Sequence, residues 1–164
     1  MARNMLHIVR GLPGTGKSTF VQKQLGGMLQ IENDQVWIDP EGKYNYIEGD
    51  QSRELVRDYT KHMVTAAMQK KVNLAVSRVN MSERSVRELV ELAKAFDYDF
   101  KIWLMDKNNT NMFSNVHNVP DKSIAFMTEH FDHILPWEQT VVTTAPCFSG
   151  YCYKFTQLKG KENT

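Results

Sequence analysis

Apolar residues occur along the chain in two alternating patterns, short continuous runs and helically spaced positions. The runs predict strands at residues 5–10, 28–31, 72–77 and 100–105, and a closing hairpin from 140–144 and 151–155. The helical spacings fall between the strands, at 19–25, after Asp50, after Ser82 and at 120–131. This alternation predicts an α/β fold, a central parallel sheet with helices on both faces. We expect the first strand in the middle and the antiparallel hairpin at one edge.

Two of the predicted helices have clear starts and apolar faces. Asp50 and Ser82 are suited to cap the second and third helices. The expected inner face of the second helix is Leu55, Val56, Tyr59, Met63, Ala66 and Ala67. That of the third is Val86, Leu89, Val90, Ala93 and Phe96. The stretches 37–49 and 106–119 are predicted to be loops, since the first is punctuated by Pro and Gly and the second is polar.

The composition is that of one soluble domain, expected at residues 1–158 and followed by a disordered polar tail at 159–164. Of the 164 residues, 41% are hydrophobic and 24% charged. The net charge of +1 gives no general attraction to nucleic acid. No apolar run is long enough for a membrane span, and no secretory signal precedes the first strand. We therefore expect a cytoplasmic protein and no membrane partner, with the oligomeric state left open.

Cys147 and Cys152 flank the turn of the predicted hairpin. They could lie opposite one another and pair, but reduced thiols are the favoured interpretation, because disulfides are rare in cytosolic proteins. Two thiols alone make no metal site, and the five histidines fall at no ligand spacing with them.

Residues 11–18 read Gly-Leu-Pro-Gly-Thr-Gly-Lys-Ser and complete the pattern G-x-x-x-x-G-K-[ST] between a strand and a helix. Such a loop surrounds phosphate oxygens with backbone N–H groups at a helix N-terminus. Lys17 would reach the β- and γ-phosphates, and the Ser18 hydroxyl would bind Mg²⁺. The alternative is a glycine-rich turn without a ligand. We expect ATP and Mg²⁺ as cofactors, with the nucleotide held by Gly11, Pro13, Gly14, Thr15, Gly16, Lys17, Ser18 and Thr19.

Three classes of protein share this loop, and two of them fit poorly. A small GTPase needs Asn-Lys-x-Asp for the guanine, which the segment beginning at Asp106 does not supply. A motor-type ATPase has an apolar strand ending in acids, whereas the third strand here ends in Arg78. A small kinase remains, with a carboxylate soon after the second strand and a polar lid before the last helix.

The chain resembles the phage-type polynucleotide 5′-kinase family and related small P-loop kinases of the zeta-toxin and AAA-like ATP-binding group. The phosphate loop, Ile-Glu-Asn-Asp at 31–34, Val-Ser-Arg-Val-Asn at 76–80 and the lid-like segment 114–120 carry the resemblance. It implies a kinase-type three-layer sandwich. Four positions depart from the family pattern. Arg78 and Gln35 stand where the family has acids. Ser114 stands where it has the lid arginine, and Trp37 where it has a substrate-binding arginine.

The resemblance also implies roles for individual residues. Asp34 occupies the place of the general base that takes a proton from the acceptor hydroxyl; its alternative role is a helix cap. Arg78 departs from the family pattern, so its role is argued from the residue itself: the guanidinium could supply positive charge to the triphosphate or the acceptor phosphate, or form a surface ion pair. Lys17, Asp34 and Arg78 are thus the candidate catalytic residues.

Three further residues, with Asp34, are candidates for binding the acceptor. Asn80 could contact it or form an Asx turn. Trp37 could stack on a base or pack in a loop. His117 lies in the lid-like segment, where a hydrogen bond that shapes the loop is the favoured role.

The expected function is ATP-dependent phosphoryl transfer to a hydroxyl, with the 5′-hydroxyl of a polynucleotide as favoured acceptor by resemblance. A nucleoside, a modified base hydroxyl in DNA or a small metabolite is an alternative acceptor. A nucleotide-binding protein that has lost transfer and acts through a partner is the alternative outside the enzymes.

Overall fold

A computed structural model describes residues 3–26, 28–32, 40–41, 50–111, 121–134, 136–148 and 150–160. The strands are β1 (Met5–Arg10), β2 (Leu29–Glu32), β3 (Leu74–Ser77), β4 (Asp99–Met105), β5 (Gln139–Cys147) and β6 (Gly150–Leu158). The helices are α1 (Lys17–Gln24), α2 (Asp50–Gln69), α3 (Glu83–Ala95) and α4 (Asp121–Glu129), with a 3₁₀ turn at Lys107–Asn111. No helix within the described ranges is both long and apolar enough to cross a membrane.

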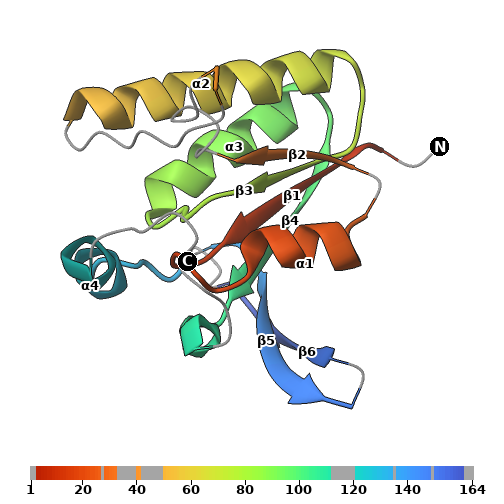
Figure 1. Ribbon diagram of the computed structural model, residues 1–164. Helices are drawn as coiled ribbons and strands as arrows, with labels where there is room; N and C mark the ends of the chain where they lie inside the picture. Colours follow the sequence, from red (N-terminus) through yellow and green to blue (C-terminus); the bar gives the residue numbers. More distant parts are fainter. Residues whose placement is uncertain are drawn as a thin grey trace.

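The strands form one sheet in the order β2-β3-β1-β4-β5-β6. All neighbours run parallel except β5 and β6, which pair antiparallel. In Figure 1, α2 and α3 cover one face of the sheet, α1 covers the other, and α4 lies beyond the carboxyl ends of the strands. The predicted parallel sheet, with β1 inside it and an antiparallel hairpin at the edge, is therefore confirmed.

Two apolar clusters hold the layers together. On one face Leu6, Ile8 and Val76 pack against α2 and α3, and on the other Val9 and Ala75 pack against Phe20 and Val21 of α1. Side chains alternate between faces along each strand, so the two clusters use alternate residues of the same strands. The predicted face of α3 is confirmed, with Val86, Leu89, Val90 and Ala93 buried. The predicted face of α2 is partly wrong, since Leu55 and Ala66 are exposed whereas Val64 and Met68 are buried.

The start of α3 shows why the sequence predicted it well. The Ser82 hydroxyl accepts a hydrogen bond from the backbone N–H of Ser85 at 3.2 Å and so caps the helix. The hairpin, by contrast, is longer than predicted, and its first strand reaches Cys147. Of the predicted tail, Gly160 lies against the carbonyl of Pro136, and residues 161–164 fall outside the described part of the chain.

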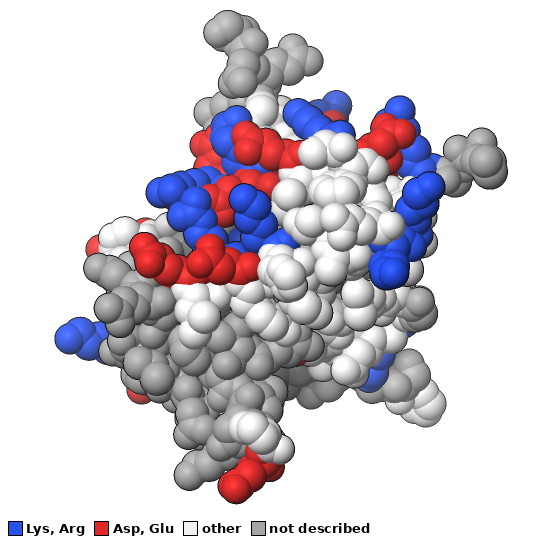
Figure 2. All heavy atoms as spheres, turned by 90° about the horizontal axis from the view of Figure 1, so that it is seen from above, with Lys and Arg blue, Asp and Glu red and all other residues white. Residues whose placement is uncertain are grey.

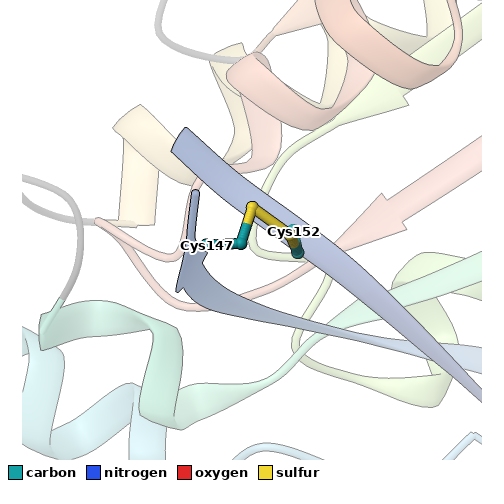
Figure 3. The surroundings of a disulfide bond; sticks show 2 residues. All are labelled: Cys147 and Cys152. Atoms are coloured by element: carbon teal, nitrogen blue, oxygen red, sulfur yellow. A yellow bond between two sulfur atoms is a disulfide. The ribbon is translucent and has the colours of Figure 1, made fainter. Parts of the chain in front are cut away.

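The expectation of reduced thiols is wrong: Cys147 and Cys152 form a disulfide at the tip of the β5–β6 hairpin (Figure 3). Cys147 pairs with Gly150, and Cys152 pairs with Ala145, so the two cysteines lie diagonally across the hairpin. Their Cα atoms are 5.7 Å apart, within the range that a disulfide spans. The strand register thus brings the two thiols close enough to bond, although the expected cytoplasmic location had favoured reduced thiols.

Candidate active site

The phosphate loop turns tightly between β1 and α1 because its glycines adopt conformations that other residues avoid. Gly14 and Gly16 have φ of 80° and 89°, in the left-handed region where a Cβ is costly. Gly11 is constrained by space instead, since a Cβ there would lie 2.7 Å from the Thr15 hydroxyl and 2.8 Å from Cβ of Met105. The loop therefore favours glycine at all three positions, of which the sequence pattern specifies Gly11 and Gly16.

Residues of the loop other than glycine stabilise this turn. The buried Thr15 hydroxyl donates to the Leu12 carbonyl at 2.7 Å, so its side chain faces the loop interior. Lys17 is the first residue of α1, and its ammonium donates to the carbonyls of Gly11 and Leu12, each at 3.0 Å. Pro13 and Thr19 are half-buried and Ser18 is exposed. The loop thus holds Lys17 over its own concave backbone, next to the N-terminus of α1, where phosphate oxygens are favoured.

The Ser18 hydroxyl donates to a carboxylate oxygen of Glu32, the last residue of β2. The same oxygen accepts from the side-chain amide of Gln30 at 2.8 Å. Glu32 was part of the motif at 31–34 but was not predicted as a site residue. Its position at the end of a parallel strand was the available signal, because ligands collect at the carboxyl ends of such sheets.

The tip of β3 carries Arg78 and Asn80, which bind each other. The Arg78 guanidinium donates to the Asn80 side-chain oxygen, and the Asn80 amide donates to the Val9 carbonyl at 3.3 Å. Asn80 is buried with φ of 48°, a left-handed conformation that Asn tolerates well. These bonds shape the loop after β3; contact of Asn80 with an acceptor stays a prediction.

Arg78 is half-buried and lies on the side of the sheet covered by α2 and α3. Burial lowers the pKa of Arg78 to about 10; Glu88 on α3 opposes this shift and Arg57 on α2 adds to it. The guanidinium therefore remains charged at neutral pH. Among the described residues its side chain donates to Asn80, so its action on a transferred phosphate remains a prediction.

Arg10, which precedes the loop directly, has a structural role that the sequence did not reveal. It is fully buried and donates to the carbonyls of Asn80 at 3.0 Å and Asp132 at 2.6 Å and to the Gln139 side chain at 2.9 Å. Its guanidinium also lies 4.4 Å from the centre of the Phe131 ring. Burial lowers the pKa of Arg10 to about 9, with Asp132 opposing. Arg10 thus ties the end of β1 to the loop after β3, the segment after α4 and β5.

Three of the predicted site residues, Asp34, Trp37 and His117, and the lid position Ser114 lie outside the described residues. The structure accordingly brings together the phosphate loop, Glu32 and the β3 tip at one edge of the sheet. Within the described ranges, no three His, Cys, Asp or Glu side chains gather as metal ligands.

A parallel sheet with a phosphate loop after β1 and helices on both faces is the fold of the small P-loop kinases. The model of one family of AAA domains, AAA_33, matches residues 6–135. The chain therefore belongs to this AAA domain family. The matched region ends before the β5–β6 hairpin.

Individual proteins give the same picture of the fold. The chain is 28% identical over 140 residues to an L-seryl-tRNA(Sec) kinase of Methanococcus maripaludis, covering 78% of this chain and 52% of the relative. The chain thus spans about half the length of that curated relative. Among solved structures, the Pnkp1/Rnl/Hen1 RNA repair complex has a chain that matches with a TM-score of 0.58 and 18% identity, over 80% of this chain and 47% of that one. A gluconokinase from Sinorhizobium meliloti 1021 matches with a TM-score of 0.58 and 14% identity, over 87% of this chain and 84% of the gluconokinase chain.

Proposed function

We propose that this chain is an ATP-dependent kinase that transfers the γ-phosphate to a hydroxyl group, with the 5′-hydroxyl of a polynucleotide as its favoured acceptor. The observation that carries the proposal is the phosphate loop, with its left-handed glycines and inward-held Lys17, at the carboxyl edge of a kinase-type sheet. Phosphoryl transfer depends mainly on positioning and on neutralising charge, and Lys17 provides the cation at the start of α1.

In the proposed reaction, the acceptor oxygen forms a bond to the γ-phosphorus as the bond from that phosphorus to the β–γ bridging oxygen breaks. The acceptor proton passes to the Asp34 carboxylate, and ADP leaves. Mg²⁺, when bound with ATP, neutralises phosphate charge. The Lys17 ammonium binds the β- and γ-phosphates, and the backbone N–H groups at the start of α1 orient them.

The choice of a polynucleotide rests on the residue resemblance and on two of the similar proteins. One is named as a kinase of a seryl-tRNA and the other comes from an RNA repair complex. A small metabolite is the second candidate, because the gluconokinase matches over most of both chains and not over a part of a larger protein.

The charge on the surface restricts where a polynucleotide could bind. On the face covered by α2 and α3, acidic and basic side chains are interleaved (Figure 2). They include the ion pairs Arg57–Glu88 at 2.5 Å, Arg84–Glu88 at 3.7 Å and Arg87–Glu83. Over the described part of this face, such mixed charge gives a phosphodiester backbone no continuous attraction. We therefore place the acceptor at the carboxyl edge of the sheet, beside the phosphate loop.

The test measures transfer of label from γ-labelled ATP with Mg²⁺ to 5′-hydroxyl DNA, 5′-hydroxyl RNA, tRNA, nucleosides and sugar acids. Label on the 5′ end of an oligonucleotide is expected. Label on a sugar acid alone would establish the metabolite kinase instead, and no label on any acceptor, despite ATP binding, would favour the nucleotide-binding protein.

Asp34→Asn tests the general base in the same assay. Asn keeps the size of the side chain but cannot take a proton, so turnover should fall by at least about a hundredfold with ATP affinity little changed. Asp58→Asn, an exposed carboxylate on α2, is the matched control and should turn over like the parent. Full turnover by Asp34→Asn would mean that Asp34 is not the base.

A further inference from the structure

Three residues lie in one row across the carboxyl ends of β1, β3 and β2. Val9 pairs with Ser77, and Ser77 pairs with Glu32. Val9 and Ala75 pack on the α1 side of the sheet. Because side chains alternate along a strand, Ser77 faces the same side as Ala75, and Glu32 faces away from Ile31 toward α1. The row therefore brings Ser77 and Glu32 to the face where α1 begins.

Glu32 crosses the end of β3 to reach the phosphate loop. Its carboxylate accepts from the Ser18 hydroxyl, and Gln30 on the same strand donates to that oxygen at 2.8 Å. The amide of Gln30 thus orients the carboxylate before any ligand binds. An alcohol oxygen and a carboxylate oxygen in contact are hard oxygen ligands of the kind that Mg²⁺ prefers.

A second observation at this row also indicates a missing polar partner. The Ser77 hydroxyl is buried, with 3% of the residue exposed, and has no hydrogen-bond partner among the described residues. A buried hydroxyl without a partner costs free energy, and an ordered water of a hydrated cation would satisfy it. These residues therefore fit a hydrated Mg²⁺ beside Ser18.

The strand that usually provides the acid does not do so here. In other proteins with this loop, the Ser or Thr of the loop shares Mg²⁺ with an aspartate from a strand. Here β3 continues into Arg78, a cation bound to Asn80. A further cation close to Lys17 requires a negative group, and the Glu32 carboxylate contacts the loop through Ser18.

We infer that Glu32, at the end of β2, supplies with Ser18 the protein ligands for the Mg²⁺ of bound ATP, in place of an acid at the tip of β3. This inference rests on the proposed function, because it concerns the metal of the same nucleotide. The structural alternative is that Glu32 only holds α1 to β2 through Ser18.

Calorimetry of a non-hydrolysable ATP analogue, with Mg²⁺ and with EDTA, separates the two roles. The readout is the metal-dependent gain in affinity, the dissociation constant in EDTA divided by that in Mg²⁺. Glu32→Gln should reduce this gain at least about tenfold. Affinity in EDTA should stay the same or tighten, since a negative charge near the triphosphate is removed. Gln can still accept from Ser18, so a purely structural role would leave the gain unchanged.

Four variants complete the design. Glu91→Gln, an exposed carboxylate on α3, makes the same charge change away from the loop and should leave the gain unaltered. Glu32→Asp should recover part of it. Ser18→Ala should lower it, and Ser18→Ala with Glu32→Gln should lose less than the sum of the single losses, because both residues would bind one ion.

The outcomes distinguish the inference from the function on which it rests. A parent that gains affinity with Mg²⁺ and a Glu32→Gln variant with the same gain would overturn the inference alone. A folded parent that binds no ATP analogue in either buffer would overturn the proposed function, and the inference with it.

Discussion

At the scale of single residues, the position of the Lys17 ammonium is the main feature of the phosphate loop. Lys17 donates to two carbonyls of the loop that would surround the phosphates. Its charge is therefore in place before the nucleotide arrives, and little side-chain entropy is lost on binding. The same arrangement fixes the ammonium at the start of α1, where an alanine would leave no charge.

Lys17→Ala should weaken ATP binding strongly, by a few kcal/mol, because charge-assisted contacts to the β- and γ-phosphates are lost. Calorimetry with MgATP measures this effect. Lys23→Ala removes a lysine of the same helix at its other end and is the control, with affinity close to that of the parent. Unchanged affinity in Lys17→Ala would contradict the assignment of the loop.

A variant of Arg78 tests whether the tip of β3 supplies the charge of the family's lid arginine. In this chain the lid position holds Ser114. An arginine that acts on the transferred phosphate contributes about 10³-fold or more to turnover. Arg78→Ala should thus abolish residual transfer with only a modest loss of ATP affinity, because the contact strengthens as charge develops. Arg84→Ala, an exposed arginine on α3, is the control. Parental transfer by Arg78→Ala would show that the arginine serves only Asn80.

At the scale of elements, Arg10 joins four segments that meet beneath the loop. Its guanidinium binds the Asn80 carbonyl after β3, the Asp132 carbonyl after α4 and Gln139 at the start of β5. A buried cation is costly unless every donor has a partner, and here the partners come from different elements. Arg10 therefore helps to hold the segment after α4, together with the bond from the Asp132 backbone N–H to the Met81 carbonyl at 2.9 Å.

Arg10→Met should reduce the free energy of unfolding by about 3 kcal/mol or more, because buried acceptors lose their donor while the volume is largely kept. Denaturant unfolding followed by circular dichroism measures the loss. Arg3→Met is the control, since Arg3 pairs with exposed Asp97 and Asp99 and its side chain is 59% exposed. A loss no greater than that of Arg3→Met would contradict the role given to Arg10.

At the scale of the whole molecule, the sequence was informative wherever local chemistry decides the structure. The Ser82 cap and the inner face of α3 depend on residues close together in the chain, and both were predicted correctly. The tight turn at residues 11–18 depends on local glycines in the same way. The parallel direction of the strands followed from strand–helix alternation, because parallel strands require crossovers. The full order of the strands was not predicted. These features fix the class of fold with little tertiary information.

The features that the sequence did not reveal depend on register between distant elements. Glu32 reaches Ser18 only because β2 pairs with β3 so that Glu32 is level with Ser77. The partners of Arg10 come from β5 and from the segment after α4, which are distant from it in the sequence. The disulfide likewise required the hairpin register. Spacing along the chain contains none of this information.

The stability of the whole domain should depend on pH through one histidine of the central strand. The Trp103 indole N–H donates to Nδ1 of His7 at 2.9 Å, which requires that nitrogen to be unprotonated. Burial, with a smaller contribution from Lys101, lowers the pKa of His7 from 6.5 to about 4. Between these two values the unfolded chain binds a proton that the folded chain does not. Stability is thus fully present above pH 6.5 and falls as the pH decreases toward 4.

His7→Gln should reduce this dependence, because the amide oxygen can still accept from Trp103 but does not titrate. Thermal melting at pH 7 and pH 5 checks it: the melting temperature of the parent should fall more between the two than that of His7→Gln. His62→Gln, which removes an exposed histidine of α2, should behave like the parent. Carboxylates titrate over part of the same range and contribute equally to all three proteins, so the difference between variants isolates His7. An equal fall in the parent and His7→Gln would mean that His7 titrates as freely in the folded chain as in the unfolded one.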